Sequence, residues 1–171
     1  GTVLLAYFGG VLRQNGIDRR MYSTQSLAEW VISLLPELYP NVWASCPLTR
    51  LDGRALLFKW AGREAGEAAV LMAHYDVVPV VEEMWEKPPF AGILEDGVLW
   101  GRGTLDTKVT FNGILYAANS LIGKGFQPEN DIYFAFSGGE EVNGKGASNI
   151  VDYFESKGLD LALVVDEGGA V

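Results

Sequence analysis

The chain is poor in cysteine, histidine and basic residues, and each shortage excludes a class of protein. Cys46 is the single cysteine, which excludes an internal disulfide framework and a multi-cysteine zinc site, so any metal ligands must be oxygen and imidazole. Lysine and arginine together number 13 against 22 acidic residues, which gives a net charge of -9. Because nucleic acids and anionic membranes bind clustered positive charge, we expect neither as a partner.

Long hydrophobic runs are also absent. Residues 2–8 are apolar, but this segment lacks a basic flank and is far shorter than the ~20 residues needed to span a bilayer. We interpret this segment as a strand or helix of the fold. The sequence shows no secretion signal, and we favour a cytoplasmic location. The 171 residues are 49% hydrophobic, which is enough for one domain with a sizeable core.

The periodic apolar patterns that are present predict an α/β fold, with a mixed twisted sheet flanked by helices. Helical spacing runs from 23 to 35, where Pro36 is expected to end the helix, and recurs at 109–122 and 147–157. Short apolar runs predict strands at 42–49, 55–60, 68–73, 98–100, 131–136 and 161–165, with a hairpin turn at 51–54. The last run is continuous, which is typical of a strand buried on both faces.

Polar side chains recur where these predicted strands end. In an open α/β sheet, ligands gather beyond the carboxyl ends of the strands, so we expect these side chains to converge. Imidazole with several carboxylates suits zinc, or less specifically manganese or cobalt. The residues at these points are His74, Asp76, Asp106, Glu140, Glu141 and Asp166.

Two of these points suggest particular roles. His74 is the only histidine, and Asp76 two residues later can share its side of a strand and accept a hydrogen bond from the imidazole of a metal ligand. Glu140 and Glu141 are neighbours that point in different directions, so one can bind a metal while the other accepts a proton from water. Either feature alone is more often an ordinary core histidine or a solvated acidic pair.

Five motifs resemble those of the M20 metallopeptidases in their order and spacing. This family consists of zinc amidohydrolases, and the resemblance is to its carboxypeptidase S and N-acyl-amino-acid hydrolase branch. The resemblance covers the chain from about residue 20 to its end, and joint matches are much less ambiguous than single ones. The matching segments are LMAHYDVVP at 71–79, Trp85 with PPFAG at 88–92, GRGTLDTK at 101–108, FSGGEEV at 136–142 and VDEGG at 165–169.

The resemblance implies two zinc ions and hydrolysis of a peptide or N-acyl-amino-acid bond by a water that bridges them. By it, His74 and Asp166 bind the first ion, Asp106 bridges both ions, and Glu141 binds the second. It also makes Glu140 the general base, assigns Asp76 to orienting His74, and implies a cis peptide between Asp106 and Thr107. Glu167 competes with Asp166 for its role; Asp166 is favoured because it directly follows the apolar run.

The chain departs from the family pattern at several points. Thr107 replaces a second aspartate, no histidine follows His74 to complete the second metal site, and no lid domain is present. We therefore expect residues 1–171 to be the N-terminal part of a single catalytic domain, inactive by itself, with any homodimer contact in the lid. The alternative is a non-catalytic metal-binding or partner-binding remnant of such a domain.

Overall fold

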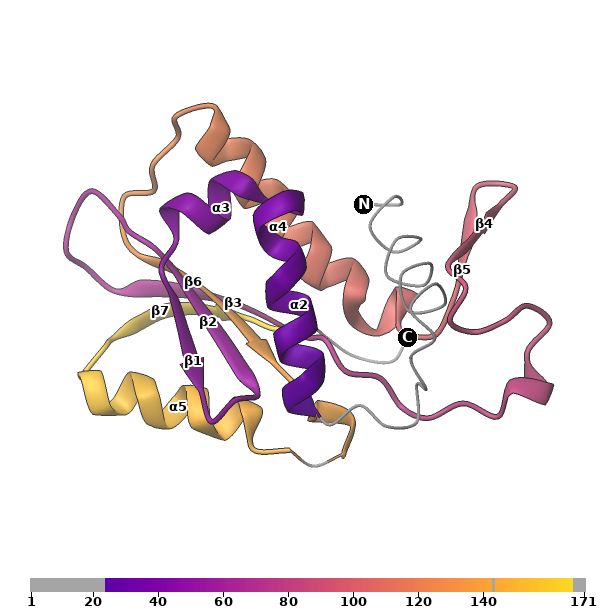
Figure 1. Ribbon diagram of the computed structural model, residues 1–171. Coiled ribbons are helices and arrows are strands. Elements are labelled where there is room, and N and C mark those ends of the chain that lie inside the picture. Colours follow the sequence, from indigo (N-terminus) through magenta and orange to yellow (C-terminus); the bar gives the residue numbers. More distant parts are fainter. Residues whose placement is uncertain (1–23, 143, 168–171) are drawn as a thin grey trace.

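A computed structural model describes residues 24–142 and 144–167. Its centre is a five-stranded mixed sheet with the strand order β1-β2-β6-β3-β7 (Figure 1). The strands are β1 (Leu48–Leu51), β2 (Ala55–Trp60), β3 (Ala68–His74), β6 (Ile132–Ser137) and β7 (Leu161–Val165). The pairs β1/β2 and β2/β6 are antiparallel, whereas β6, β3 and β7 run parallel. The predicted α/β class is confirmed.

Helices cover both faces of this sheet (Figure 1). On one face lie α2 (Thr24–Leu38), α3 (Pro40–Ser45) and α4 (Val109–Gly123), and on the other lies α5 (Gly146–Lys157). Phe136 of β6 is fully buried on the three-helix face, with its ring centroid 4.5 Å from that of Phe111. Burying one such side chain contributes about 1.5–3 kcal/mol, so the sheet is anchored firmly under the helices.

A second, smaller sheet projects from the body as an arm (Figure 1). It consists of β4 (Ile93–Glu95) and β5 (Val98–Trp100), and the short helix η1 (Glu82–Met84) precedes it. Lys87 pairs with Glu95 and lies over the ring of Trp100, while the guanidinium of Arg102 lies 5.0 Å from the ring centroid of Trp85. These contacts join the loop at 85–87 to the two-stranded arm and to Arg102, which follows it.

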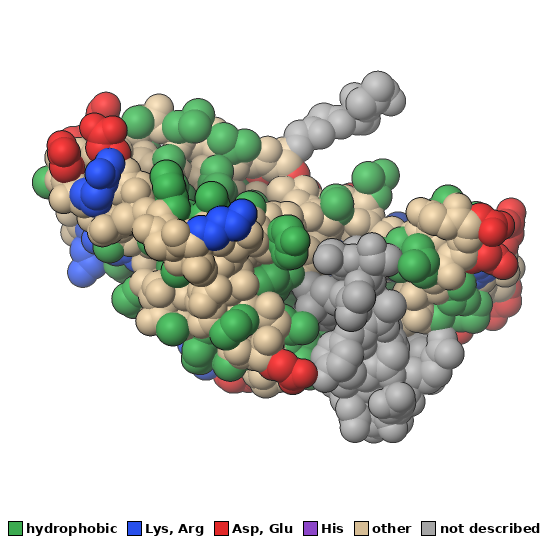
Figure 2. Space-filling model, turned by 90° about the horizontal axis from the view of Figure 1, so that it is seen from above, with side chains coloured by type: hydrophobic (Ala, Val, Ile, Leu, Met, Phe, Trp, Pro, Cys, Tyr) green, Lys and Arg blue, Asp and Glu red, His purple; other side chains and the backbone are tan. Residues whose placement is uncertain are grey.

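Figure 2 shows hydrophobic side chains spread over one face of the described residues. Acidic side chains gather at both ends of this view, with a few more between them. Among the described residues, no helix is both long and apolar enough to cross a membrane.

Two predicted boundaries near the start of the described chain are wrong. Pro36 lies inside α2 instead of ending it. Leu35 and Tyr39 are buried, and the backbone N–H of Tyr39 donates a 2.8 Å hydrogen bond to the oxygen of Leu35 across the proline. The predicted strand at 42–49 is partly α3, which begins at Pro40, a residue preorganised for the first helical turn. Tertiary packing outweighs the helix-ending effect of Pro36, and helix initiation at Pro40 outweighs the local strand pattern.

The expectation that residues 161–165 are buried on both faces is also wrong. These residues form β7 as predicted, but β7 is the outermost strand and pairs with β3 on one side. Leu163, Val164 and Val165 remain about half exposed. A continuous apolar run predicts a strand, but it does not predict which other elements lie beside that strand.

Candidate metal centre

The candidate site lies where the parallel strands end. His74 is the last residue of β3 and is paired in register with Ser137, the last residue of β6, while Glu167 follows the end of β7 by two residues. The short helices η2 (Thr104–Lys108) and η3 (Glu140–Val142) lie at the same edge and carry the other acids. Parallel strands bring their carboxyl ends together, which is why His74, Glu167 and the glutamate pair after β6 meet here, whereas Asp106 comes from the segment that leads into α4.

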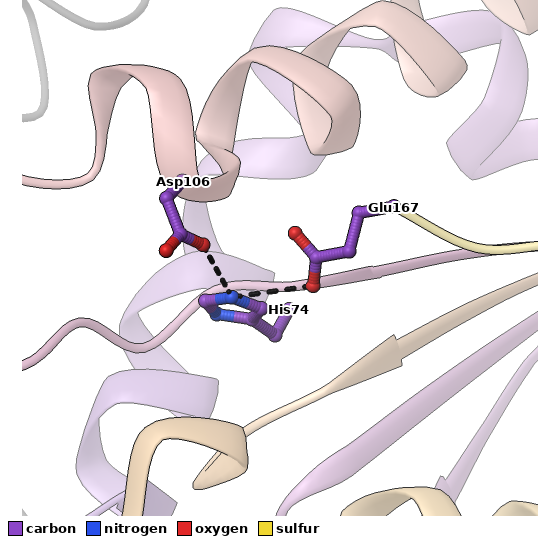
Figure 3. Close-up of side chains that lie close together, drawn as sticks. All are labelled: His74, Asp106 and Glu167. Atoms are coloured by element: carbon purple, nitrogen blue, oxygen red, sulfur yellow. Dashed lines mark hydrogen bonds and ion pairs between the residues drawn. The ribbon is translucent and has the colours of Figure 1, made fainter. Parts of the chain in front are cut away.

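The Nε2 atom of His74 faces three carboxylates. It lies 3.0 Å from Asp106 Oδ1, 3.3 Å from Glu167 Oε1 and 3.9 Å from Glu140 Oε2. Figure 3 shows Asp106 and Glu167 approaching the imidazole from two sides. The histidine side chain is 2% exposed, whereas those of Asp106 and Glu140 are 69% and 55% exposed. A buried imidazole therefore presents one nitrogen to an accessible group of acids.

The other ring nitrogen is held by Asp76. His74 Nδ1 lies 3.1 Å from the backbone oxygen of Asp76 and 3.4 Å from its Oδ1. A carbonyl oxygen only accepts hydrogen bonds, so Nδ1 carries a proton and Nε2 is the nitrogen left to face the acids. Burial lowers the pKa of His74, but the hydrogen bonds to Asp76 and Asp106 and the charge of Glu167 outweigh it and raise the pKa to about 9.

Asp76 also fixes the backbone of the glutamate pair. Its Oδ1 accepts the N–H of Glu140 at 3.2 Å, and its Oδ2 accepts the N–H of Glu141 at 3.1 Å. Burial raises the pKa of this carboxyl. The hydrogen bonds from His74 and from the backbone N–H groups of the turn lower it by more, so the pKa lies below its usual value. One buried carboxylate thus sets the relative positions of the imidazole and both glutamates.

A glycine turn lets this arrangement close. A Cβ atom at Gly138 would lie 2.3 Å from the hydroxyl oxygen of Tyr75, so any side chain there would collide with that ring. The Tyr75 hydroxyl itself donates a hydrogen bond to the backbone oxygen of Arg54 and cannot move aside freely. The close approach explains why glycine precedes the glutamate pair.

The donor set fits a divalent metal ion. Three described residues, His74, Asp106 and Glu167, each offer a ligand atom, and these atoms lie within 4.8 Å of one another. Nε2 and the carboxylate oxygens can approach so closely only with a proton or a cation between them, because all are acceptors when deprotonated. Imidazole and carboxylate together are zinc-type ligands, with manganese or cobalt as alternatives.

The structure places Glu167, rather than Asp166, beside His74. The side chain of Asp166 is exposed, and its Oδ1 accepts the N–H of Glu167 at 2.9 Å. Sequence reasoning weighed both residues and preferred Asp166 because it directly follows the strand. No periodicity extends beyond the end of β7, so the sequence carried no signal for which of the two side chains turns inward.

The segment around Asp106 has two further features. The peptide bond between Asp106 and Thr107 is cis, as the resemblance implied. Thr107, which stands where the family has a second aspartate, is buried, and its hydroxyl donates to that of Thr110 at 3.0 Å. A hydrogen-bonded threonine thus fills this position without an additional charge.

Sequence reasoning assigned no role to Lys108, although it is part of a matching motif. Its Nζ donates a 3.1 Å hydrogen bond to the backbone oxygen of Tyr75, between His74 and Asp76. Burial lowers the pKa of Lys108 to about 8, against the opposing effect of the nearby carboxylates. The signal that could have identified it is a lysine two residues after a predicted metal ligand in an acidic site.

Comparisons with known proteins find a matching family and several relatives of this chain. A sequence model described as Peptidase family M20/M25/M40 matches residues 70–170. The N-fatty-acyl-amino acid synthase/hydrolase PM20D1 of Xenopus tropicalis is 40% identical over 141 residues, which are 80% of this chain and 28% of that protein. The probable carboxypeptidase S-like 2 of Dictyostelium discoideum is 37% identical over 134 residues, 76% of this chain and 26% of that protein. The chain thus spans about a quarter of the length of these relatives.

A solved structure has the same fold. The M20 family metallo-carboxypeptidase Sso-CP2 from Sulfolobus solfataricus superposes with a TM-score of 0.64 and 25% sequence identity. The match covers 84% of this chain and 32% of that chain. The mixed sheet with helices on both faces is therefore part of a larger catalytic domain in that protein.

Proposed function

The chain belongs to the M20/M25/M40 peptidase family, and from this premise we propose that it is the N-terminal part of the catalytic domain of a metal-dependent amide hydrolase. The observation that carries the proposal is the surroundings of His74. Its Nδ1 is held by Asp76, while its Nε2 faces the carboxylates of Asp106, Glu167 and Glu140. This is the donor set of a metal centre with an acid beside it.

We propose the following ligands for two zinc ions. His74 and a carboxylate of the 166–167 pair bind the first ion, with Glu167 favoured over the predicted Asp166 by its distance of 3.3 Å from Nε2. Asp106 would serve both ions, and Glu141 would bind the second. The histidine that the family uses for the second ion is not within residues 1–171, so that ion would complete its coordination outside this sequence.

The metal ions, when bound, supply polarisation of the scissile carbonyl and a lower pKa of the attacking water. Glu140 accepts the proton of that water at its carboxylate and delivers it to the leaving amine. Its backbone N–H is anchored to Asp76, whereas its side chain is 55% exposed and accessible to substrate. Asp76 keeps the His74 proton on Nδ1, which leaves Nε2 available as a ligand.

The substrate we propose is a small peptide or an N-acyl amino acid. The relatives support this range, because one is named an N-fatty-acyl-amino acid synthase/hydrolase and another a probable carboxypeptidase S-like protein. Both substrate types contain a secondary amide next to a carboxylate-bearing residue.

The test is a Glu140→Gln substitution in the complete protein, with Glu155→Gln on the exposed face of α5 as the matched control. Loss of a general base typically costs 10²–10⁴-fold, so we expect turnover of N-acyl amino acids or dipeptides to fall by at least about 100-fold. Zinc content should stay unchanged, and the control should retain activity. If Glu140→Gln kept its turnover, the proposed base would be wrong.

Metal analysis of the same preparations distinguishes the alternative, a non-catalytic remnant. Stoichiometric zinc together with hydrolysis of these substrates would exclude that alternative. Zinc without any hydrolysis in the complete wild-type protein would favour it over the enzyme.

A further inference from the structure

Lys108 is a half-buried cation in an acidic site, and the proposed chemistry does not use it. Its Nζ donates a hydrogen bond of 3.1 Å to the backbone oxygen of Tyr75. Tyr75 stands between His74 and Asp76, so this bond reaches the strand end that carries the imidazole. Lys108 itself ends η2, the segment that contains Asp106. One side chain thus joins two separate parts of the metal centre.

The path of this side chain depends on a glycine. A Cβ atom at Gly103 would lie 2.9 Å from Lys108 Nζ and 2.5 Å from Val77 Cγ1. The backbone N–H of Lys108 donates to the oxygen of the same Gly103 at 3.0 Å, which closes the turn. The ammonium therefore passes over a position without a side chain to reach Tyr75, and its route is tightly defined.

This ammonium donates its hydrogen bond to a backbone carbonyl, although carboxylates lie nearby. The carboxylates of Asp76, Asp106 and Glu141 are close enough to interact with its charge. An ammonium that is partly shielded from water needs hydrogen-bonded partners to offset its lost hydration. Here the ammonium donates a hydrogen bond to the backbone oxygen of Tyr75, which fixes the position of the strand end. The carboxylates stay available for other partners.

We propose that Lys108 is a positioning residue of the metal centre, whose hydrogen bond to Tyr75 holds the strand end with His74 in register with the turn that carries Asp106. The inference rests on the proposed function, since it assumes that these two residues bind a metal. It differs from the family-derived assignments, which give roles only to the ligands, the base and the aspartate behind His74.

Charge and position predict opposite effects when Lys108 is replaced. If the ammonium acted only through its charge, removing it would strengthen the binding of a divalent cation, because like charges repel. If it acts by positioning, removing it would weaken that binding despite the lost repulsion. The sign of the change in metal affinity therefore separates the two roles.

The experiment compares Lys108→Met, Lys108→Arg and the wild type in the complete protein, with Lys124→Met at the exposed end of α4 as control. The apparent zinc dissociation constant is measured by competition with a chelator, and unfolding of the metal-free protein is followed in urea. Loss of a group that orients metal ligands typically costs about 10–100-fold in affinity, so we expect at least a tenfold loss for Lys108→Met. Lys108→Arg keeps a positive donor and should recover most of it, and Lys124→Met should match the wild type.

Three results would overturn the inference: unchanged affinity in Lys108→Met, tighter binding in it, or equal losses in the Met and Arg variants. Equal losses would indicate lost packing instead of a lost donor. If Lys108→Met does not fold, Lys108→Gln replaces it with the same expected loss, because its shorter amide cannot span the same distance. If the wild-type protein binds no zinc, the proposed function itself fails, which is a separate result.

Discussion

Replacing Asp76 with asparagine would test how the site is assembled. The carboxylate accepts backbone N–H groups from Glu140 and Glu141 and holds His74 at Nδ1. An asparagine of the same shape has one oxygen and one NH₂ group, and the NH₂ cannot accept a hydrogen bond. One backbone N–H of the glutamate pair would therefore lose its partner, and the imidazole would lose the negative charge behind it.

The size of the effect follows from these contacts. A buried donor left without a partner costs about 1–3 kcal/mol, and each hydrogen bond to a charged group contributes about 1.5–3 kcal/mol. Because the asparagine oxygen keeps part of this network, we expect the metal-free Asp76→Asn protein to lose about 2–4 kcal/mol of its free energy of unfolding. Zinc affinity should fall about 10–100-fold, as it does when the partner of a ligating histidine is removed.

Two assays on the complete protein measure these effects. Urea unfolding in the presence of a chelator gives the stability of the metal-free state, and chelator competition gives the zinc affinity. Asp152→Asn on the exposed face of α5 is the control and should change stability by no more than about 0.5 kcal/mol. An Asp76→Asn protein with the stability of that control and unaltered zinc affinity would refute the assembly of the site around this carboxylate.

Two further predictions concern other carboxylates. Glu167→Gln should weaken zinc binding at least tenfold, whereas Asp166→Asn should change it less than threefold in chelator competition; the reverse order would restore Asp166 as the ligand. In Asp131, burial raises the pKa, but the hydrogen bonds from Lys59 and the Gly62 N–H outweigh it and lower the pKa, so its stabilising effect is present above pH ~4 and lost as the pH falls further. Asp131→Asn should thus cost up to about 1 kcal/mol in urea unfolding at pH 7, since both side chains of the ion pair are partly exposed. The cost should shrink as the pH falls below ~4; a cost that stays constant as the pH falls would contradict this prediction.

The sequence predicted the elements that carry the site because their signals are local and strong. Apolar runs specified β2, β3, β6 and β7, and helical spacing specified α4 and α5, with Gly158 ending the latter at φ 59°. The turn after β1 was predicted from Asp52-Gly53, whose positive φ values of 50° and 65° suit these residues. Since parallel strands end together, the pattern predicted that His74 would lie near acids that follow other strands, and Glu140 after β6 does lie near it.

What the sequence could not predict depends on contacts between distant residues. The inward turn of Glu167 is decided beyond the end of a strand, where no alternation constrains the side chain. The exposure of β7 depends on which neighbours lie beside it, and the proposed role of Lys108 depends on its hydrogen bond to Tyr75, which is 33 residues away in the sequence. In each of these cases the local pattern was correctly recognised, but the packing partner was not encoded nearby.

The central claim is that the acids around His74 hold metal ions that the hydrolysis requires. The most direct measurement is turnover of an N-acyl amino acid or a dipeptide by the complete protein before and after exhaustive removal of metal, followed by addition of zinc. We predict that the metal-free protein is inactive and that zinc restores turnover as about two ions bind per protein. Full activity in the metal-free protein would contradict the account.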